Sequence, residues 1–345
     1  MSDRRAAYGT LLVGMVAFGG TWPAGKVAAD HVPPAVIAVS RFATAALLLW
    51  LWAHRSGRPV ARPRRVDLPL VLVLGATVVF AYNLFFLYGV RHSTAADGSV
   101  LVPGLIPVAT ALLAWAVRGE RPRRRSQIGL AVAFAGLLLV ASPTGGVGSD
   151  RILGDVLFVG AAISWSVYTL AGRRAIARYG SVSANVYATA AGTVLLLPFT
   201  FLDGGWSPLV HAPASALAGI AYLSVIGTVF GFVAFYEGVR MIGAARAASF
   251  ALLVPIFGVL SSVLVLHEPL RVTLALGGAV VICGLWLAES GRAATTIEES
   301  SRRRKHDRHA LVDPRSRPVP DPDGGWDDHG ALVLVAAPRR AARRA

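Results

Sequence analysis

Three polar side chains interrupt long apolar runs of this 345-residue sequence, and their chemistry is the first guide to what the chain can do. Arg41 and Glu237 are ionisable, and Asn83 carries an amide that both donates and accepts hydrogen bonds. At the centre of a membrane-spanning helix, a charged side chain costs about 3 kcal/mol on insertion scales. Each of these residues therefore requires a partner, water or a ligand.

Arg41 stays protonated in proteins, so carbonyl groups, a carboxylate or water must match its charge. One interpretation is a site for the carboxylate of a bound small molecule. The other is a structural ion pair, with Asp30 as a candidate partner. The residue types leave both interpretations open.

Glu237 could bind a proton or a cationic small molecule. It lies three residues before Arg240 on the same face of a helix, so we favour an interfacial carboxylate near that arginine. Asn83 lies in the middle of its apolar run beside Tyr82, where the amide must find a partner on another helix or on a ligand. Tyr82 and Asn83 are therefore candidate binding residues.

Aromatic residues with polar neighbours form a second group of candidates. Trp22 lies in the first apolar run, and Trp165, Ser166 and Tyr168 lie in the sixth. Aromatic walls with one or two polar groups suit amphipathic small molecules. The alternative is that these side chains anchor helices at the membrane surface or pack within a bundle.

Four prolines inside apolar runs are candidate hinges. Pro23, Pro103, Pro107 and Pro255 each remove a backbone donor and bend or break a helix. Pro107 and Pro255 occupy equivalent places in an internal repeat, which favours paired hinges near a binding site. A bend that serves only packing is the alternative.

Acidic residues at helix ends are interpreted as structural. Asp97 opens the fourth apolar run, where its charge complements the helix dipole. Glu120 and Glu268 lie at equivalent helix ends and are interpreted as anchors.

Motifs for catalysis and metal binding are missing from the sequence. It contains no phosphate-binding loop, no His-Glu-x-x-His, no Cys-x-x-Cys and no Gly-x-Ser-x-Gly. We therefore expect no catalytic residues, no metal, no cofactor and no direct drive by ATP.

The candidate residues lie on ten apolar stretches, each close to the length of about 20 residues that crosses a bilayer. These stretches are too long for barrel strands and do not alternate, and backbone hydrogen bonding in lipid then leaves helices. We predict an all-α, polytopic membrane protein with ten transmembrane helices, at roughly 8–28, 34–53, 68–90, 95–117, 127–142, 153–171, 183–202, 214–237, 245–266 and 271–289.

The composition agrees with this class. The formal net charge is +15, 54% of the residues are hydrophobic, and Cys283 is the only cysteine. These values exclude a disordered chain, a disulfide-built secreted domain and an ordinary cytosolic enzyme. A basic nucleic-acid binder would need a soluble fold to carry its cations, and the apolar runs leave none. No nucleic-acid partner is expected.

Arginine marks alternate loops along the apolar region. The N-terminus and the second, fourth, sixth and eighth loops carry several cations, whereas each of the other loops carries one or none. By the positive-inside rule, both termini lie in the cytoplasm. The dominance of Arg over Lys, with abundant Ala, Gly and Val, suggests a bacterial source and hence the cytoplasmic membrane. Residues 290–345 read as a basic, disordered cytoplasmic tail that contacts anionic lipid headgroups.

The two halves of the apolar region repeat one another. Residues 1–145 and 150–289 each form a five-helix unit, and because five is odd the second unit is inverted. Equivalent loops accordingly carry opposite charge bias. Inverted repeats are typical of secondary transporters, whose halves rock about a site at the midplane. The matching residues are Phe86/Phe235, Gly89/Gly238, Val90/Val239 and Arg91/Arg240 at an offset of 149, and Pro107/Pro255, Glu120/Glu268, Gly129/Gly277 and Gly136/Gly284 at an offset of 148.

Residues 1–289 resemble the drug/metabolite transporter superfamily, and specifically its ten-helix members with two EamA domains. The resemblance rests on Gly20-Thr21-Trp22 through Lys26, on Arg41-Phe42, and on the glycine, proline and glutamate series of the repeat. It implies export of small metabolites, such as amino acids or hydrophobic cations, without ATP and often with proton coupling. The second half has Thr189 where the first has Arg41, so any role of that arginine is one-sided.

Together these features predict a secondary transporter that exports small metabolites or drugs by alternating access, and not an enzyme. The expected partners are a small-molecule substrate and membrane lipids. Two alternatives stay open: a membrane-embedded enzyme acting on lipid-linked substrates, and a non-transporting sensor that signals through the basic tail. The substrate, the coupling ion, the direction of transport and the oligomeric state do not follow from the sequence.

Overall fold

The computed structural model describes residues 2–55, 65–142, 149–243, 247 and 249–290. The predicted tail, apart from Ser290, lies outside these residues. Helices dominate the described part, which contains no β-strand. The elements are α1 (Ser2–Gly19), α2 (Thr21–Ala29), α3 (Pro34–Arg55), η1 (Arg65–Asp67), α4 (Leu68–Leu74), η2 (Gly75–Ala81), α5 (Tyr82–His92), α6 (Ala95–Arg118), α7 (Arg124–Ala141), α8 (Ser149–Leu202), α9 (Ser207–Val210), α10 (Ala214–Ala221), η3 (Tyr222–Phe230), α11 (Gly231–Ile242), α13 (Leu253–Leu266) and a last helix at Val272–Ser290.

The prediction of a helical, polytopic membrane protein is confirmed. Within the described residues, eight helical stretches are long and apolar enough to cross a membrane. Two shorter apolar helices, Pro34–Leu48 and Leu253–Leu266, lie where two further spans were predicted. The count of ten transmembrane helices stays a prediction.

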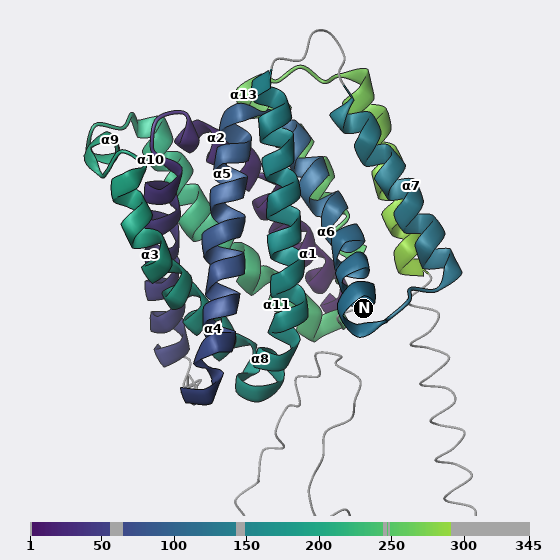
Figure 1. Ribbon diagram of the computed structural model, residues 1–345, viewed down its shortest axis with the longest axis horizontal. Coiled ribbons are helices and arrows are strands. Elements are labelled where there is room, and N and C mark those ends of the chain that lie inside the picture. Colours follow the sequence, from purple (N-terminus) through teal and green to yellow (C-terminus); the bar gives the residue numbers. More distant parts are fainter. Residues whose placement is uncertain (1, 56–64, 143–148, 244–246, 248, 291–345) are drawn as a thin grey trace, which may run out of the picture.

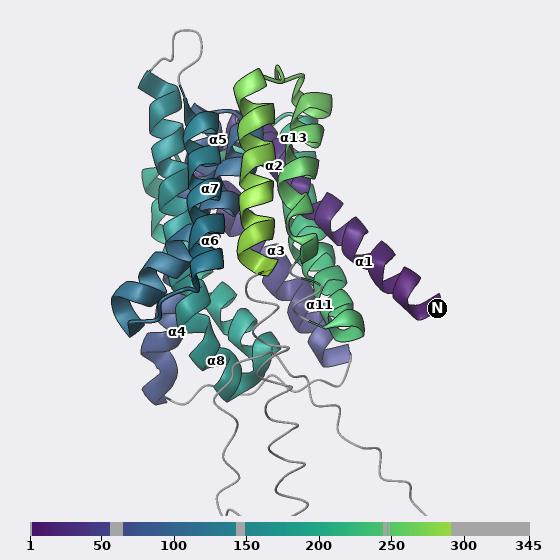
Figure 2. The ribbon, with the colours of Figure 1, turned by 90° about the vertical axis from the view of Figure 1, so that its right-hand side faces the viewer.

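The helices stand side by side and give the molecule two ends (Figure 1). The links around α9 and the C-terminal end of α13 lie at the upper end, and α4 and the turn of α8 lie at the lower end. The described part of α1 begins toward the lower end, as Figure 2 shows from the side. Arg55, Arg65, Arg118 and Arg124 are at helix ends of the lower side.

The helical assignment of α8 runs through residues 172–182, where a loop was expected, but α8 is not straight. The Tyr168 hydroxyl donates to Asn185 Oδ1 at 2.9 Å. In a straight α-helix, 17 residues would separate these positions by about 25 Å. The chain therefore turns back on itself between them, and the two limbs of α8 correspond to two predicted spans.

Two spans contain a π-helical segment, and the segments occupy equivalent places in the repeat. The first is η2, between α4 and α5, and the second is η3, between α10 and α11. An offset of 148 carries residues 75–81 onto 223–229, inside η3. Such segments open the regular i to i−4 ladder and are frequent at functional sites.

A glycine contact joins α7 to the last helix. A Cβ added to Gly136 would lie 2.8 Å from the Gly277 carbonyl oxygen, and one added to Gly129 would lie 2.6 Å from that of Gly284. The residue numbers run in opposite directions, so the helices are antiparallel. The repeat relates Gly129 to Gly277 and Gly136 to Gly284, so exchanging the halves turns one pair into the other. We call these four residues the glycine seam.

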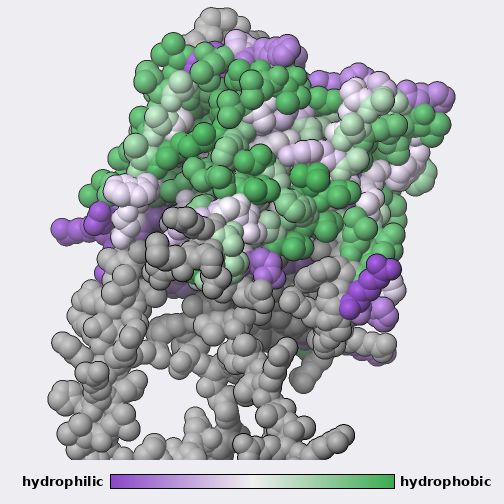
Figure 3. All heavy atoms as spheres, turned by 180° about the vertical axis from the view of Figure 1, so that it is seen from behind, coloured by the Kyte–Doolittle hydropathy of each residue, from purple (hydrophilic) through white to green (hydrophobic). Residues whose placement is uncertain are grey.

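Large apolar side chains cover the outside of the bundle. Leu72, Leu138, Val194, Leu264 and Trp286 are among those that are half exposed or more. On the face in Figure 3, hydrophobic residues form a broad band with polar residues near its margins. A soluble monomer rarely exposes so large an apolar surface, whereas lipid accepts it.

Candidate functional site

A cavity of about 380 Å³ lies inside the bundle and is lined by both halves of the chain. We call it the central cavity. Five of the predicted binding residues line it, namely Trp22, Arg41, Tyr82, Asn83 and Trp165, as do three of the predicted hinge prolines, Pro103, Pro107 and Pro255. Residues distant in sequence are thus brought together around one space.

Arg41 is the charged centre of this site. Its side chain is only 9% exposed. Nε donates to Thr228 Oγ1 at 2.9 Å, and Nη1 donates to Asn83 Oδ1 at 3.2 Å. The guanidinium also lies 5.0 Å from the ring centroid of Phe42. Of the two interpretations of Arg41, the structure does not show the pairing with Asp30, which instead accepts from Lys26 Nζ at 2.9 Å.

The two π-helical spans supply the acceptors of Arg41. Asn83 follows η2 and donates through Nδ2 to the Val78 carbonyl at 2.9 Å. Thr228 lies in η3 and donates to the Leu223 carbonyl at 2.8 Å. Each side chain thus bonds a carbonyl five residues earlier and then accepts from Arg41. The irregular backbone of both halves orients one guanidinium.

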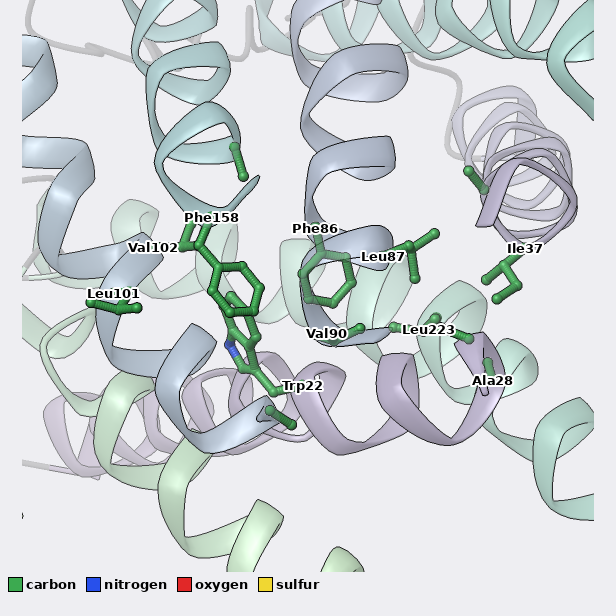
Figure 4. Packing of buried hydrophobic residues seen from close by; sticks show 14 of the residues in the cluster. Trp22, Ala28, Ile37, Phe86, Leu87, Val90, Leu101, Val102, Phe158 and Leu223 are labelled. Atoms are coloured by element: carbon green, nitrogen blue, oxygen red, sulfur yellow. The ribbon is translucent and has the colours of Figure 1, made fainter. Parts of the chain in front are cut away.

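Aromatic rings form two walls of the cavity. Trp22 is 3% exposed and contacts Phe86 and Phe158, with ring centroids 4.9 and 5.9 Å away (Figure 4). On another wall, Tyr82 and Trp165 have ring centroids 5.0 Å apart. These rings offer an apolar surface next to the charge of Arg41.

Three predicted binding residues, Ser166, Tyr168 and Glu237, and one predicted hinge, Pro23, lie away from the cavity lining. Ser166 is fully buried, and its Oγ lies 2.8 Å from the Ala162 carbonyl oxygen and 3.1 Å from that of Ile106, so its one hydroxyl proton is donated within the bundle. Tyr168 contacts Trp165 but directs its hydroxyl to Asn185. Glu237 is half-buried in α11 and is not a lining residue.

Pro23 lines a separate groove, together with Tyr222 and Phe257 among others. Several residues of this groove are exposed on the outer surface, such as Leu260 and Leu264. The structure therefore places Pro23 on a different face from the other three prolines.

Two residues of the site escaped the sequence reasoning. Thr228 looked like an ordinary helix residue, and only its π-helical context makes it the partner of Arg41. Glu289 lines the cavity from the last turn of the helix Val272–Ser290. Glu289 lies next to the start of the predicted tail, which is why it was not among the candidate residues. An acidic residue inside an apolar helix is nevertheless a signal that could have identified it.

An ion cluster of Asp97, Arg151, Asp155 and Arg271 connects α6, α8 and the chain that follows α13. Asp97 is fully buried, pairs with Arg271 through Oδ1, and lies 3.4 Å from Arg151 Nε through Oδ2. Arg151 Nε is also 4.0 Å from Asp155. The predicted role of Asp97 at the helix start is thus incomplete, because its carboxylate binds two arginines that are distant in sequence. We call these four residues the upper ion cluster.

Glu268 adds a second connection at the upper end. Its carboxylate accepts from the backbone N–H groups of Ala95 and Ala96, both at 2.9 Å. These are free donors of the first turn of α6, so the carboxylate caps that helix. Burial raises the pKa of Glu268 above its usual value, although the two backbone donors oppose the rise. Glu268 therefore ties the link after α13 to α6.

Known proteins resemble this chain over most of its length, up to residue 289. The profile described as "EamA-like transporter family" matches residues 5–142 and again 152–289. An "Uncharacterized transporter" of Archaeoglobus fulgidus is 29% identical over 80% of this chain and 95% of its own. A "Probable terminal-alkyne amino-acid exporter" of Streptantibioticus cattleyicolor is 33% identical, over 80% of this chain and 91% of its own. One crystal structure shares the fold, with a TM-score of 0.58 and 21% identity over 81% of this chain and 95% of that one.

Proposed function

This chain belongs to the EamA-like transporter family, and from that premise we propose that it is a secondary transporter that exports a small amphipathic metabolite by alternating access. The substrates in view are amino acids, related amphipathic compounds and drugs. The observation that carries the proposal is the central cavity, which both halves line.

The distribution of cations supports an orientation with the lower end in the cytoplasm. Among the described residues, helix ends of the lower side carry Arg55, Arg65, Arg118 and Arg124, and the positive-inside rule assigns an arginine-rich side to the cytoplasm. Glu289 lines the cavity from the last turn of the helix Val272–Ser290, and that helix ends toward the lower side (Figure 2). A cavity open to the cytoplasm and closed to the outside would be the inward-facing conformation, to which the substrate of an exporter binds.

Release on the other side requires the upper end to open. The upper ion cluster and the cap of Glu268 on α6 must then separate, while the lower end closes over the cavity. The glycine seam supports a motion of two related halves. Its two glycine pairs are exchanged when one half is superposed on the other, as expected for two inverted five-helix units. The two family matches, one in each half, support the same division.

The test is transport by the purified full chain in liposomes. Liposomes loaded with a panel member, either an amino acid or a hydrophobic cation, should exchange it for labelled compound outside, faster than protein-free liposomes do. An imposed pH gradient should drive net movement if protons are coupled. The proposal fails if no member of a broad amino-acid and drug panel moves although the protein melts cooperatively, which shows that it is folded.

A further inference from the structure

The charge inside the central cavity narrows the substrate class, given the proposed transport function. Arg41 lines the cavity and is more than nine-tenths buried. Its two hydrogen-bond partners, Asn83 and Thr228, are both neutral. In the part of the chain that the structure describes, no acidic side chain forms an ion pair with Arg41.

A buried positive charge with only neutral partners is incompletely compensated, because removing a guanidinium from water costs more than two neutral hydrogen bonds return. The same bundle shows what full compensation looks like. Arg151 and Arg271 are also largely buried, and both face the carboxylate of Asp97. Arg41 is buried to a similar degree, but its hydrogen-bond partners are neutral. On the side away from Asn83 and Thr228, its guanidinium faces the central cavity.

The bonding pattern leaves Arg41 ready to bind an anion. A guanidinium has five N–H donors, and the recorded bonds use one at Nε and one at Nη1. Nη2 has no bonded protein acceptor among the described residues. Arginine forms paired, short hydrogen bonds with planar carboxylates, and here Asn83 and Thr228 already hold the guanidinium in one orientation.

We infer that the transported substrate carries a carboxylate, which binds Arg41, and an apolar part that lies against Trp22, Tyr82 and Trp165. A cavity of about 380 Å³ accommodates a molecule the size of an apolar amino acid. Glu289 lines the same cavity. Hydrophobic monocations lack the group that Arg41 binds, so the cavity disfavours them.

The experiment compares matched ligands on the full chain. The probes are leucine, methionine and phenylalanine, the corresponding amino-acid amides, which lack the carboxylate, and tetraphenylphosphonium as a hydrophobic cation. The readout is the rise in melting temperature and the quenching of tryptophan fluorescence. At least one amino acid should give both signals, and its amide should give neither.

Variants locate the effect. Arg41→Gln should weaken the binding of that amino acid at least about 30-fold, the factor expected when one member of a buried charge pair is removed. Arg41→Lys keeps the charge but loses the planar fork, so it should give an intermediate loss and serves if Arg41→Gln does not fold. Arg118→Gln, at the lower end outside the cavity, is the matched control and should bind as the wild type does.

The outcomes separate the two proposals. If tetraphenylphosphonium or the amides bind and are transported as well as the amino acids, and Arg41→Gln leaves this unchanged, the carboxylate inference is wrong and the transporter proposal stands. If the folded chain neither binds nor moves any probe, both proposals fail. Loss of amino-acid binding in Arg41→Gln with normal binding in Arg118→Gln supports the inference.

Discussion

At the scale of single residues, the site depends on which side chains face Arg41. Two neutral acceptors hold its guanidinium, whereas a carboxylate in either place would satisfy the charge permanently. Asn83 therefore matters to the charge of the site as much as Arg41 does, because its amide orients the guanidinium without neutralising it. Asparagine and aspartate have nearly the same shape, so the electrostatic argument can be tested with little change in packing.

Asn83→Asp should place a fixed carboxylate against Arg41 and compete with the substrate. We expect the melting temperature without ligand to rise, and the affinity for the best-binding amino acid to fall by about tenfold or more, because the new ion pair must be broken for binding. Calorimetric melting with and without the amino acid measures both changes. Asn185→Asp, which alters the acceptor of Tyr168 away from the cavity, is the control. Unchanged affinity in Asn83→Asp would count against a carboxylate at Arg41.

At the scale of elements, the two π-helical segments are the features that sequence reasoning did not predict. The apolar runs of residues 68–90 and 214–237 indicate spans, but hydropathy has no period that separates a π-helical turn from an α-helical one. The side chains that follow from this geometry, Asn83 and Thr228, bond carbonyls five residues earlier. Asn83 could be selected because an amide is rare in a span, whereas a threonine is common there and carries no such signal.

Thr228→Val should destabilise the protein, because it removes the acceptor of Arg41 Nε and the donor to the Leu223 carbonyl. Leaving buried polar groups unbonded costs about 1–3 kcal/mol each. Thr193→Val is the matched control, since among the described residues that hydroxyl bonds to the carbonyl of Thr189 in its own helix and to no other residue. Thermal unfolding in detergent should show a larger fall in melting temperature for Thr228→Val. Equal falls would mean that the contact with Arg41 contributes little.

At the scale of the whole molecule, the sequence predicts the features that depend on hydropathy along the chain. It does not predict which residues distant in sequence contact one another. The helical class, the outer apolar surface and the convergence of Trp22 and Trp165 on one cavity all follow from patterns along the chain. The pairing of Asp97 with Arg151 and Arg271 joins residues 54 and 174 positions apart, and no local pattern reports such a distance. Equally, hydropathy did not reveal which face of a helix Ser166 and Pro23 occupy.

Asp97→Asn should loosen the closed upper end. The variant removes the negative charge that separates Arg151 from Arg271, and breaking a buried ion pair costs several kcal/mol. Ser99, two residues further along α6, is fully buried. In a Cys283→Ser background, Ser99→Cys should react with a membrane-impermeant maleimide from outside the cell about tenfold faster or more when Asp97→Asn is present.

The control for this labelling is Asp150→Asn, which changes an exposed acidic residue at the same end. It should leave the reaction rate of Ser99→Cys unchanged. Equal rates in all three backgrounds would show that the upper ion cluster does not hold that end closed.

The glycine seam has a consequence for how the two halves can move. Gly136 faces Gly277 and Gly129 faces Gly284 with backbones almost in contact, and interchanging the halves reproduces the same pairs. In the proposed rocking motion, which exchanges the roles of the halves, the contacts of this seam would be preserved. The seam would then be the axis about which the two ends open and close in turn. Substitutions of cavity residues would then change the substrate specificity without changing the contact about which the halves move.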